Sequence, residues 1–108
     1  MSVTVKKISF EELRKAAVDT HNEYYESRAE KAGNFHIDIQ VEDVPEDILQ
    51  EWMIALIQDE MICVEGEFES YNQKKIAILN AIKETYPELS DELNRHISIF
   101  ESRLSSRN

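Results

Sequence analysis

The chain has 108 residues, of which 22 are acidic and 12 are basic, so its formal net charge is −10. This length is typical of one domain, and we expect a single domain over residues 1–108. Because phosphates would repel so acidic a protein, we expect no direct binding to nucleic acid and none to an anionic membrane surface.

The sequence favours a cytoplasmic protein. Its one cysteine, Cys63, cannot form an internal disulfide, and its place in the apolar run 61–64 indicates a buried, unreactive thiol. The N-terminus lacks the apolar stretch of a signal peptide. The longest apolar run, 52–57, is far shorter than the ~20 residues that a membrane-spanning helix needs. We therefore expect a soluble protein in a reducing compartment.

The N-terminal third predicts a strand followed by a helix. Apolar and polar residues alternate over 3–8, which is typical of a short strand. Ser9 and Glu12 have the spacing of a capping box, in which the hydroxyl accepts from an amide of the first helical turn. We expect a helix over about 10–32, ended by Gly33 and Asn34.

A second strand is predicted over residues 35–42. Strict alternation of apolar and polar side chains makes this the strongest strand signal in the chain. A lone strand leaves its backbone groups unsatisfied, and the 3–8 segment is the expected partner. The free edges of so small a sheet would be contact surfaces for another copy or for a partner protein.

The second half of the chain is predicted to be helical. Apolar residues spaced by four and three resemble a heptad seam from Ile57 to Ile82, which favours one continuous or kinked helix over about 45–86. The alternative is two helices separated near 65–67, because Gly66 weakens a helix. Pro87 predicts a turn, after which a last helix to about residue 104 folds back as a hairpin. The expected fold is mostly α: an antiparallel helical bundle with a long central helix and a small two-stranded β element.

No motif indicates an enzyme, a metal or a cofactor. The three histidines fall on three different elements, and Glu92 and His96 lack the Glu-x-x-His spacing of a carboxylate metal site. The two glycines cannot form a phosphate-binding loop. We expect no catalytic residue, no metal and no cofactor.

The charge is concentrated in one part of the sequence. Residues 32–73, which we call the acidic window, contain eleven acidic residues and no Lys or Arg, whereas the rest of the chain is nearly balanced. Clustering of one sign focuses the electric field that a basic partner meets on approach. The adjacent Tyr24 and Tyr25 cannot both face one core stripe, so one of them is expected at an interface. The candidate partner-binding residues are Asp43, Glu46, Asp47, Glu51, Asp59, Glu65, Glu69 and Tyr25.

These features favour a protein-binding module that neutralises or guards a basic partner, such as a toxin or a nucleic-acid-handling enzyme. An immunity protein, an antitoxin or an inhibitor fits this pattern, and carboxylates along a helix can imitate the phosphates of a nucleic acid. The alternatives are a secretion-type or assembly chaperone and a homo-oligomeric structural subunit, for example a dimer through the long helix.

Overall fold

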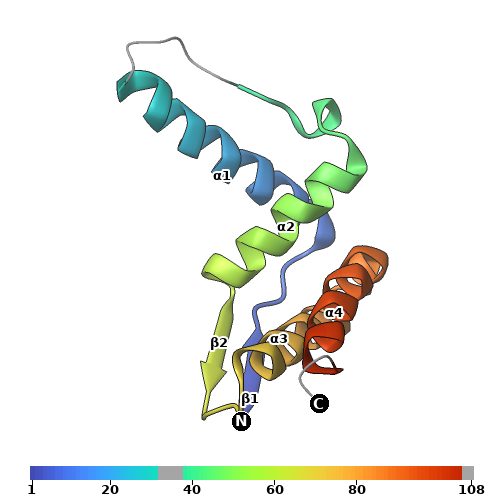
Figure 1. The fold of residues 1–108 in the computed structure, drawn as a ribbon. Coiled ribbons are helices and arrows are strands. Elements are labelled where there is room, and N and C mark those ends of the chain that lie inside the picture. Colours follow the sequence, from blue (N-terminus) through green and yellow to red (C-terminus); the bar gives the residue numbers. More distant parts are fainter. Residues whose placement is uncertain (32–37, 106–108) are drawn as a thin grey trace. The chain divides into compact units, whose positions relative to one another are not determined.

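The fold is taken from a computed structural model, which describes residues 1–31 and 38–105, and the side chains of residues 1–24 and 38–105. The described part is mostly helical with a small antiparallel sheet, which confirms the predicted fold class (Figure 1). Its helices and strands are β1 (Ser2–Val5), α1 (Phe10–Lys31), α2 (Glu46–Glu60), β2 (Ile62–Glu65), α3 (Tyr71–Thr85) and α4 (Ser90–Ser105), with short 3-10 helices at Val41–Asp43 and Pro87–Leu89.

The backbone divides into two compact units. Residues 8–56 form one unit, and residues 1–7 together with 57–108 form the other. The boundary falls inside α2. That the whole chain acts as a single domain stays a prediction.

Helix α1 begins where the capping motif places it. The Glu12 amide donates to the Ser9 hydroxyl at 3.1 Å, and that hydroxyl contacts the Glu12 carboxylate at 3.1 Å. The Ser9 carbonyl accepts the helical hydrogen bond of Leu13. Helix α1 runs from Phe10 to Lys31, so its predicted start is confirmed, whereas the predicted stop at Gly33 and Asn34 lies outside the described residues.

Helices α1 and α2 supply the apolar residues of the 8–56 unit. The His21 and Trp52 rings stack at 3.7 Å, and burial lowers the pKa of His21. Tyr24 is 55% exposed, as expected for one of two adjacent tyrosines that cannot both face the core. In the apolar stretch 48–57, one side is buried, whereas Ile48 and Ala55 are exposed. The buried apolar residues of this unit are Leu13, Ala17, Val18, Leu49, Met53, Ile54 and Leu56.

The described part of the predicted strand over 35–42 is not a strand. Residues 35–37 lie outside the described residues, Ile39 has irregular backbone, and Val41 begins a 3-10 helix. Side chains satisfy the backbone groups that a neighbouring strand would have paired. The Asn22 amide donates to the Ile39 carbonyl at 2.8 Å and accepts from the Ile39 amide at 3.0 Å. The Asp43 carboxylate accepts from the Gln40 amide at 3.0 Å.

Replacement of Asn22 by alanine is expected to lower the free energy of unfolding by about 1–2 kcal/mol, since two hydrogen bonds to one backbone residue are lost. Urea unfolding followed by the fluorescence of Trp52, the one tryptophan of the chain, measures this loss. The exposed neighbour Glu23, replaced by alanine, is the control and is expected to change stability by less than about 0.5 kcal/mol. Equal effects of the two substitutions would contradict the role given to Asn22.

The sheet of the other unit corrects the predicted strand pairing. β1 pairs antiparallel with β2, with Val3 opposite Val64 and Val5 opposite Ile62. Valines and isoleucines face inward and are half-buried, whereas Thr4, Cys63 and Glu65 are exposed. The expectation of a buried thiol at Cys63 is therefore wrong.

The break between α2 and α3 corrects the prediction of one helix over 45–86. Helix α2 ends at Glu60, β2 follows, and α3 begins at Tyr71, where the Ser70 hydroxyl caps it by accepting from the Gln73 amide at 3.2 Å. Within the predicted seam, Ile57 and Ile82 are fully buried, whereas Tyr71 is 66% exposed. The alternative of a break near 65–67 is confirmed.

Gly66 ends β2 in a conformation that side chains disfavour. Its φ is +86°, and a Cβ atom there would lie 2.9 Å from the Met1 nitrogen and 3.0 Å from the Met1 Cα. We expect Gly66→Ala to cost about 1–2 kcal/mol of stability. Gly66→Asn is expected to cost less, because asparagine tolerates positive φ better. Chemical unfolding of the three proteins measures the order, and an alanine variant as stable as the glycine protein would contradict it.

Helices α3 and α4 pack together as the predicted hairpin. Pro87 starts the 3-10 turn that joins them, since its fixed φ and missing N–H suit that position. Lys83 donates across the hairpin to the Asn94 side chain at 3.1 Å. The buried apolar residues of this unit are Ile57, Ile78, Leu79, Ile82, Tyr86, Leu89, Leu93 and Ile97.

Among residues 1–31 and 38–105, no helix is both long enough and apolar enough to cross a membrane.

Candidate functional site: an acidic groove

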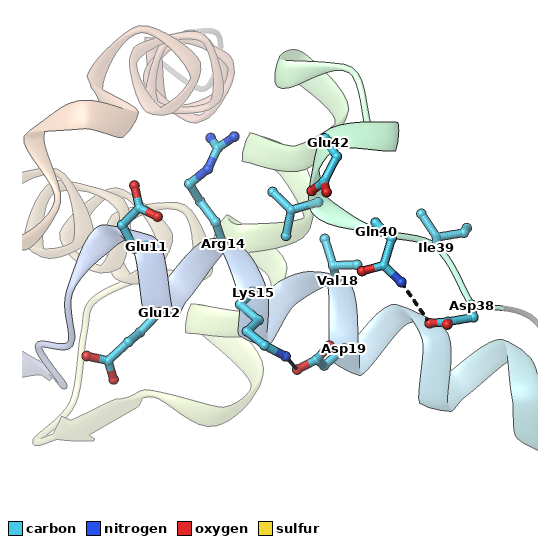
Figure 2. Close-up of a pocket in the computed structure, with 11 residues that line it drawn as sticks. Glu11, Glu12, Arg14, Lys15, Val18, Asp19, Asp38, Ile39, Gln40 and Glu42 are labelled. Carbon is cyan, nitrogen blue, oxygen red and sulfur yellow. Dashed lines mark hydrogen bonds and ion pairs between the residues drawn. The ribbon is translucent and has the colours of Figure 1, made fainter.

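A groove of about 610 Å³ lies in the 8–56 unit, between α1 and the segment 38–42 (Figure 2). We call it the acidic groove, because five of its side chains carry carboxylates and two are basic. Its lining residues are Glu11, Glu12, Arg14, Lys15, Val18, Asp19, Asp38, Ile39, Gln40, Val41 and Glu42.

Local structure explains the two walls of the groove. Glu11, Lys15 and Val18 follow one another at spacings of four and three on α1, which brings their side chains to one face of the helix. The opposite wall is held by Asn22, whose two hydrogen bonds to Ile39 fix residues 38–42 beside the helix.

Both basic side chains of the groove already have acidic partners. Lys15 lies 2.8 Å from the Asp19 carboxylate, and this hydrogen bond raises the pKa of Lys15. Arg14 pairs with Glu46. The carboxylates of Glu11, Asp38 and Glu42 have no ion pair within the described part of the chain, although Gln40 donates to Asp38 at 3.2 Å. The groove therefore presents negative charge that its own cations do not neutralise.

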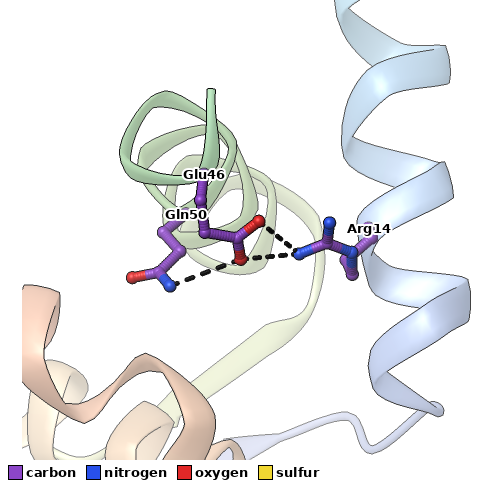
Figure 3. Close-up of polar contacts among 3 residues, drawn as sticks. All are labelled: Arg14, Glu46 and Gln50. Carbon is purple, nitrogen blue, oxygen red and sulfur yellow. Dashed lines mark hydrogen bonds and ion pairs between the residues drawn. The ribbon is translucent and has the colours of Figure 1, made fainter. Parts of the chain in front are cut away.

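The Arg14–Glu46 pair links α1 to the start of α2 (Figure 3). Arg14 Nη1 donates to the two carboxylate oxygens of Glu46 at 2.6 and 2.8 Å, and Gln50 donates to one of them at 3.5 Å. The hydrogen bond from Arg14 lowers the pKa of Glu46. Because 54% of the Glu46 side chain is exposed, water screens the pair and its contribution to stability is small.

Breaking this pair is expected to remove a pH-dependent part of the stability. The folded-state pKa of Glu46 is lower than its unfolded value of 4.5, so the contribution is complete above pH 4.5 and is lost as the pH falls through the folded pKa. Arg14→Gln is expected to lower the free energy of unfolding by less than about 1 kcal/mol near pH 7, and by still less in acid.

Unfolding curves of the wild type, Arg14→Gln, Glu46→Gln and the double variant, measured at several pH values, give the coupling energy between the two residues. A coupling energy that stays constant, or grows, as the pH falls below 4.5 would contradict this assignment.

The structure gives the seven predicted carboxylates different roles. Asp43 caps the Gln40 amide and Glu46 pairs with Arg14, so both have structural partners. Asp47, Asp59 and Glu65 are exposed and have no ion pair among the described residues. The two others are Glu51, which is exposed and has a polar partner, and Glu69, to which Gln73 donates at 3.5 Å.

These residues divide between the two units. Asp43, Glu46, Asp47 and Glu51 belong to residues 8–56, whereas Asp59, Glu65 and Glu69 belong to the other unit. The eighth candidate, Tyr25, belongs to helix α1, but the structure does not describe its side chain. Its interface role stays a prediction.

None of the residues that line the groove was predicted as a candidate, and these include three carboxylates without an ion pair in the described part of the chain, Glu11, Asp38 and Glu42. Asp38 and Glu42 lie in the acidic window, on the polar face of the strand that was predicted over 35–42, and they were not chosen as partner-binding residues. Glu11 lies between Ser9 and Glu12 of the predicted capping box and was given no role of its own. The signal that could have found them is Asn22, a polar residue in a helix interior that binds a distant backbone segment.

The arrangement suits reversible binding of cations. Exposed carboxylates accept hydrogen bonds from Lys and Arg side chains, and Arg can bind them in a bidentate way. The described side chains of each unit, taken by itself, include no set of three Asp, Glu, His or Cys residues close enough to share a metal ion. His21 stacks on Trp52, whereas His96 lies 3.6 Å from the buried carboxylate of Glu92 in the other unit.

Comparison with protein-family models, with curated proteins and with solved structures finds no match to this chain.

Proposed function

We propose that this chain is a binding module that docks on a basic partner protein and neutralises or guards it. One observation carries the proposal: within the acidic window, nine exposed carboxylates have no ion pair among the described residues. They are Asp38, Glu42, Asp43, Asp47, Asp59, Glu60, Glu65, Glu67 and Glu69.

The exposure of these carboxylates decides what they contribute. Asp43 accepts from the Gln40 amide, but none of these carboxylates has an ion pair among the described residues, and an exposed carboxylate without an ion pair adds little to stability. An approaching basic surface, in contrast, meets the summed field of many like charges, which accelerates association and orients the partner. Negative charge without internal cations is therefore better suited to recognition than to folding.

The chemistry of the partner follows from the sign of the field. A nuclease toxin or a nucleic-acid-handling enzyme has a basic surface, because it must attract phosphates. Exposed carboxylates can compete with phosphates for that surface, so the partner would lose access to nucleic acid. In this form the module acts as an immunity protein, an antitoxin or an inhibitor.

The alternatives have less support. A chaperone would use the apolar seam over 57–82 and a strand edge, and a homo-oligomer would pair through the long helix. β2 interrupts both the seam and that helix. Of the seam residues, Ile57, Ile78 and Ile82 are buried in the chain itself.

The proposal is tested by capture from a lysate of the source cells with the tagged full chain. We expect a protein with a basic surface to bind at about 50 mM salt and to be released well before about 500 mM salt, because screening weakens contacts between charges. The captured protein is then purified and titrated alone. Binding that does not change with salt, or a purified partner with no basic surface, would contradict the proposal.

A further inference from the structure

The outer edge of β2 has backbone groups that no described residue satisfies. The Lys6 amide donates to the Met61 carbonyl at 2.8 Å, which makes Lys6 and Met61 a hydrogen-bonded pair next to the β1–β2 register. Hydrogen-bonded and non-hydrogen-bonded pairs alternate along an antiparallel ladder. The backbone N–H and C=O of Cys63 therefore point toward β1, whereas those of Ile62 and Val64 point away from β1.

The other side of the sheet is covered. β1 contacts both β2 and α3, and it lies between them in Figure 1. Outside the β1–β2 ladder, no backbone hydrogen bond joins Ile62 or Val64 to another described residue. β2 is thus a strand with one free edge, which is the geometry that accepts an added strand.

The residues around this edge make it negatively charged. Residues 59–69 contain no Lys or Arg, and their five acidic side chains are exposed without an ion pair in the described part of the chain. On β2 itself, Glu65 lies on the exposed face beside Cys63, whereas Ile62 and Val64 lie on the half-buried face.

We propose that the free edge of β2 binds one extended, basic segment of the partner protein as a third strand. The inference rests on the proposed function and adds the mode of binding. Backbone hydrogen bonds to Ile62 and Val64 hold the segment, and its Lys or Arg residues lie beside Glu65 and Glu67. A second copy of this chain fits the edge less well, because pairing two such edges brings two acidic segments together.

The proposed strand has a defined pattern. Side chains alternate across a strand, so apolar residues of the segment extend the row of Ile62 and Val64, and basic residues extend the row of Glu65. A capped peptide that alternates valine and lysine over seven residues is the matching probe. Its matched controls are the same peptide with N-methylated amides at every second residue and a valine–glutamate peptide.

The test is an NMR titration of the full chain with these three peptides, with amide hydrogen exchange as a second readout. We expect the valine–lysine peptide to bind and to slow the exchange of the Ile62 and Val64 amides at least about tenfold, since hydrogen-bonded amides exchange only on opening. The N-methylated and glutamate peptides are expected to leave both amides unprotected. Equal binding of the N-methylated peptide, or no binding of the valine–lysine peptide, would overturn the edge inference.

Variants separate this inference from the proposed function. Val64→Pro removes the outward N–H and puts a ring carbon in its place at the edge, whereas Glu65→Lys with Glu67→Lys keeps the backbone and reverses the charge. We expect each to weaken peptide and partner binding at least about tenfold. If the partner binds both variants as it binds the wild type but remains salt-sensitive, the edge inference fails and the proposed function stands. Rapid formation of a Cys63 disulfide dimer on mild oxidation would instead favour a second copy and overturn the inference.

Discussion

Replacement of Tyr86 by alanine is expected to lower the free energy of unfolding by about 3–5 kcal/mol, because a fully buried aromatic ring is removed and a cavity remains. Tyr86 caps the end of α3, its amide donating to the Ile82 carbonyl at 2.7 Å. Lys7 lies over its ring, 4.8 Å from the centroid. The side chain thus joins the end of β1 to the helical hairpin.

The hydroxyl of Tyr86 makes a separable contribution. It donates to the Lys6 carbonyl at 2.7 Å across 80 positions of sequence. Tyr86→Phe keeps the ring and loses this bond, so we expect a cost of about 1–2 kcal/mol. Urea unfolding monitored by circular dichroism measures both variants. A loss for Tyr86→Ala no larger than that for Tyr86→Phe would contradict the place given to the ring in the core.

Neutralising four carboxylates of the acidic window is expected to weaken partner binding about 10- to 100-fold, mainly through slower association. The window variant combines Glu42→Gln, Asp59→Asn, Glu65→Gln and Glu69→Gln. These residues are exposed, and none has an ion pair in the described part of the chain. Asp43 and Glu46 are left intact, because they hold structure through Gln40 and Arg14.

A control variant separates local charge from net charge. It combines Glu23→Gln, Glu84→Gln, Glu88→Gln and Glu101→Gln, which are exposed positions outside the window, and it changes the net charge of −10 by the same four units. We expect the control to change the affinity less than about threefold, because distant charges are screened. Stopped-flow association with the purified partner measures both variants. If they weaken partner binding equally, the position of the carboxylates does not matter and the prediction is contradicted.

Elements with strong local signals were predicted well. The start of α1 follows from the Ser9 and Glu12 pair, and the turn before α4 follows from Pro87, because in both cases neighbouring residues fix the backbone. The hairpin of α3 and α4 follows from apolar spacing around that turn. The fold class was therefore within reach of the sequence.

The sheet was not predictable from local pattern. Ile62 and Val64 lie in the apolar run 61–64, which shows no alternation with polar residues. The heptad spacing around that run favoured a helix. Gly66 with φ +86° marks the true break. The partner of β1 lies some 60 residues away in sequence, and such a pairing depends on tertiary packing.

The candidate site was predictable in charge but only partly in residues. The acidic window predicted which part of the chain carries the negative charge. Four of its predicted residues are exposed and accessible to a partner: Asp47, Asp59, Glu65 and Glu69. The sequence alone could not separate these four from Asp43 and Glu46, which have structural partners. Asp43 accepts from Gln40, three residues before it, and Glu46 pairs with Arg14, which is distant in sequence. The acidic groove needed the bond between Asn22 and Ile39, which no spacing rule describes.

The central claim is that carboxylates of the acidic window bind a basic partner, and the dependence of Kd on salt tests it most directly. Isothermal titration of the purified partner at several salt concentrations gives the slope of log Kd against log salt for the wild type, the window variant and the control variant. We expect a steep slope for the wild type and the control, and a clearly shallower slope for the window variant. A wild-type slope near zero, or the same slope for all three proteins, would contradict the claim.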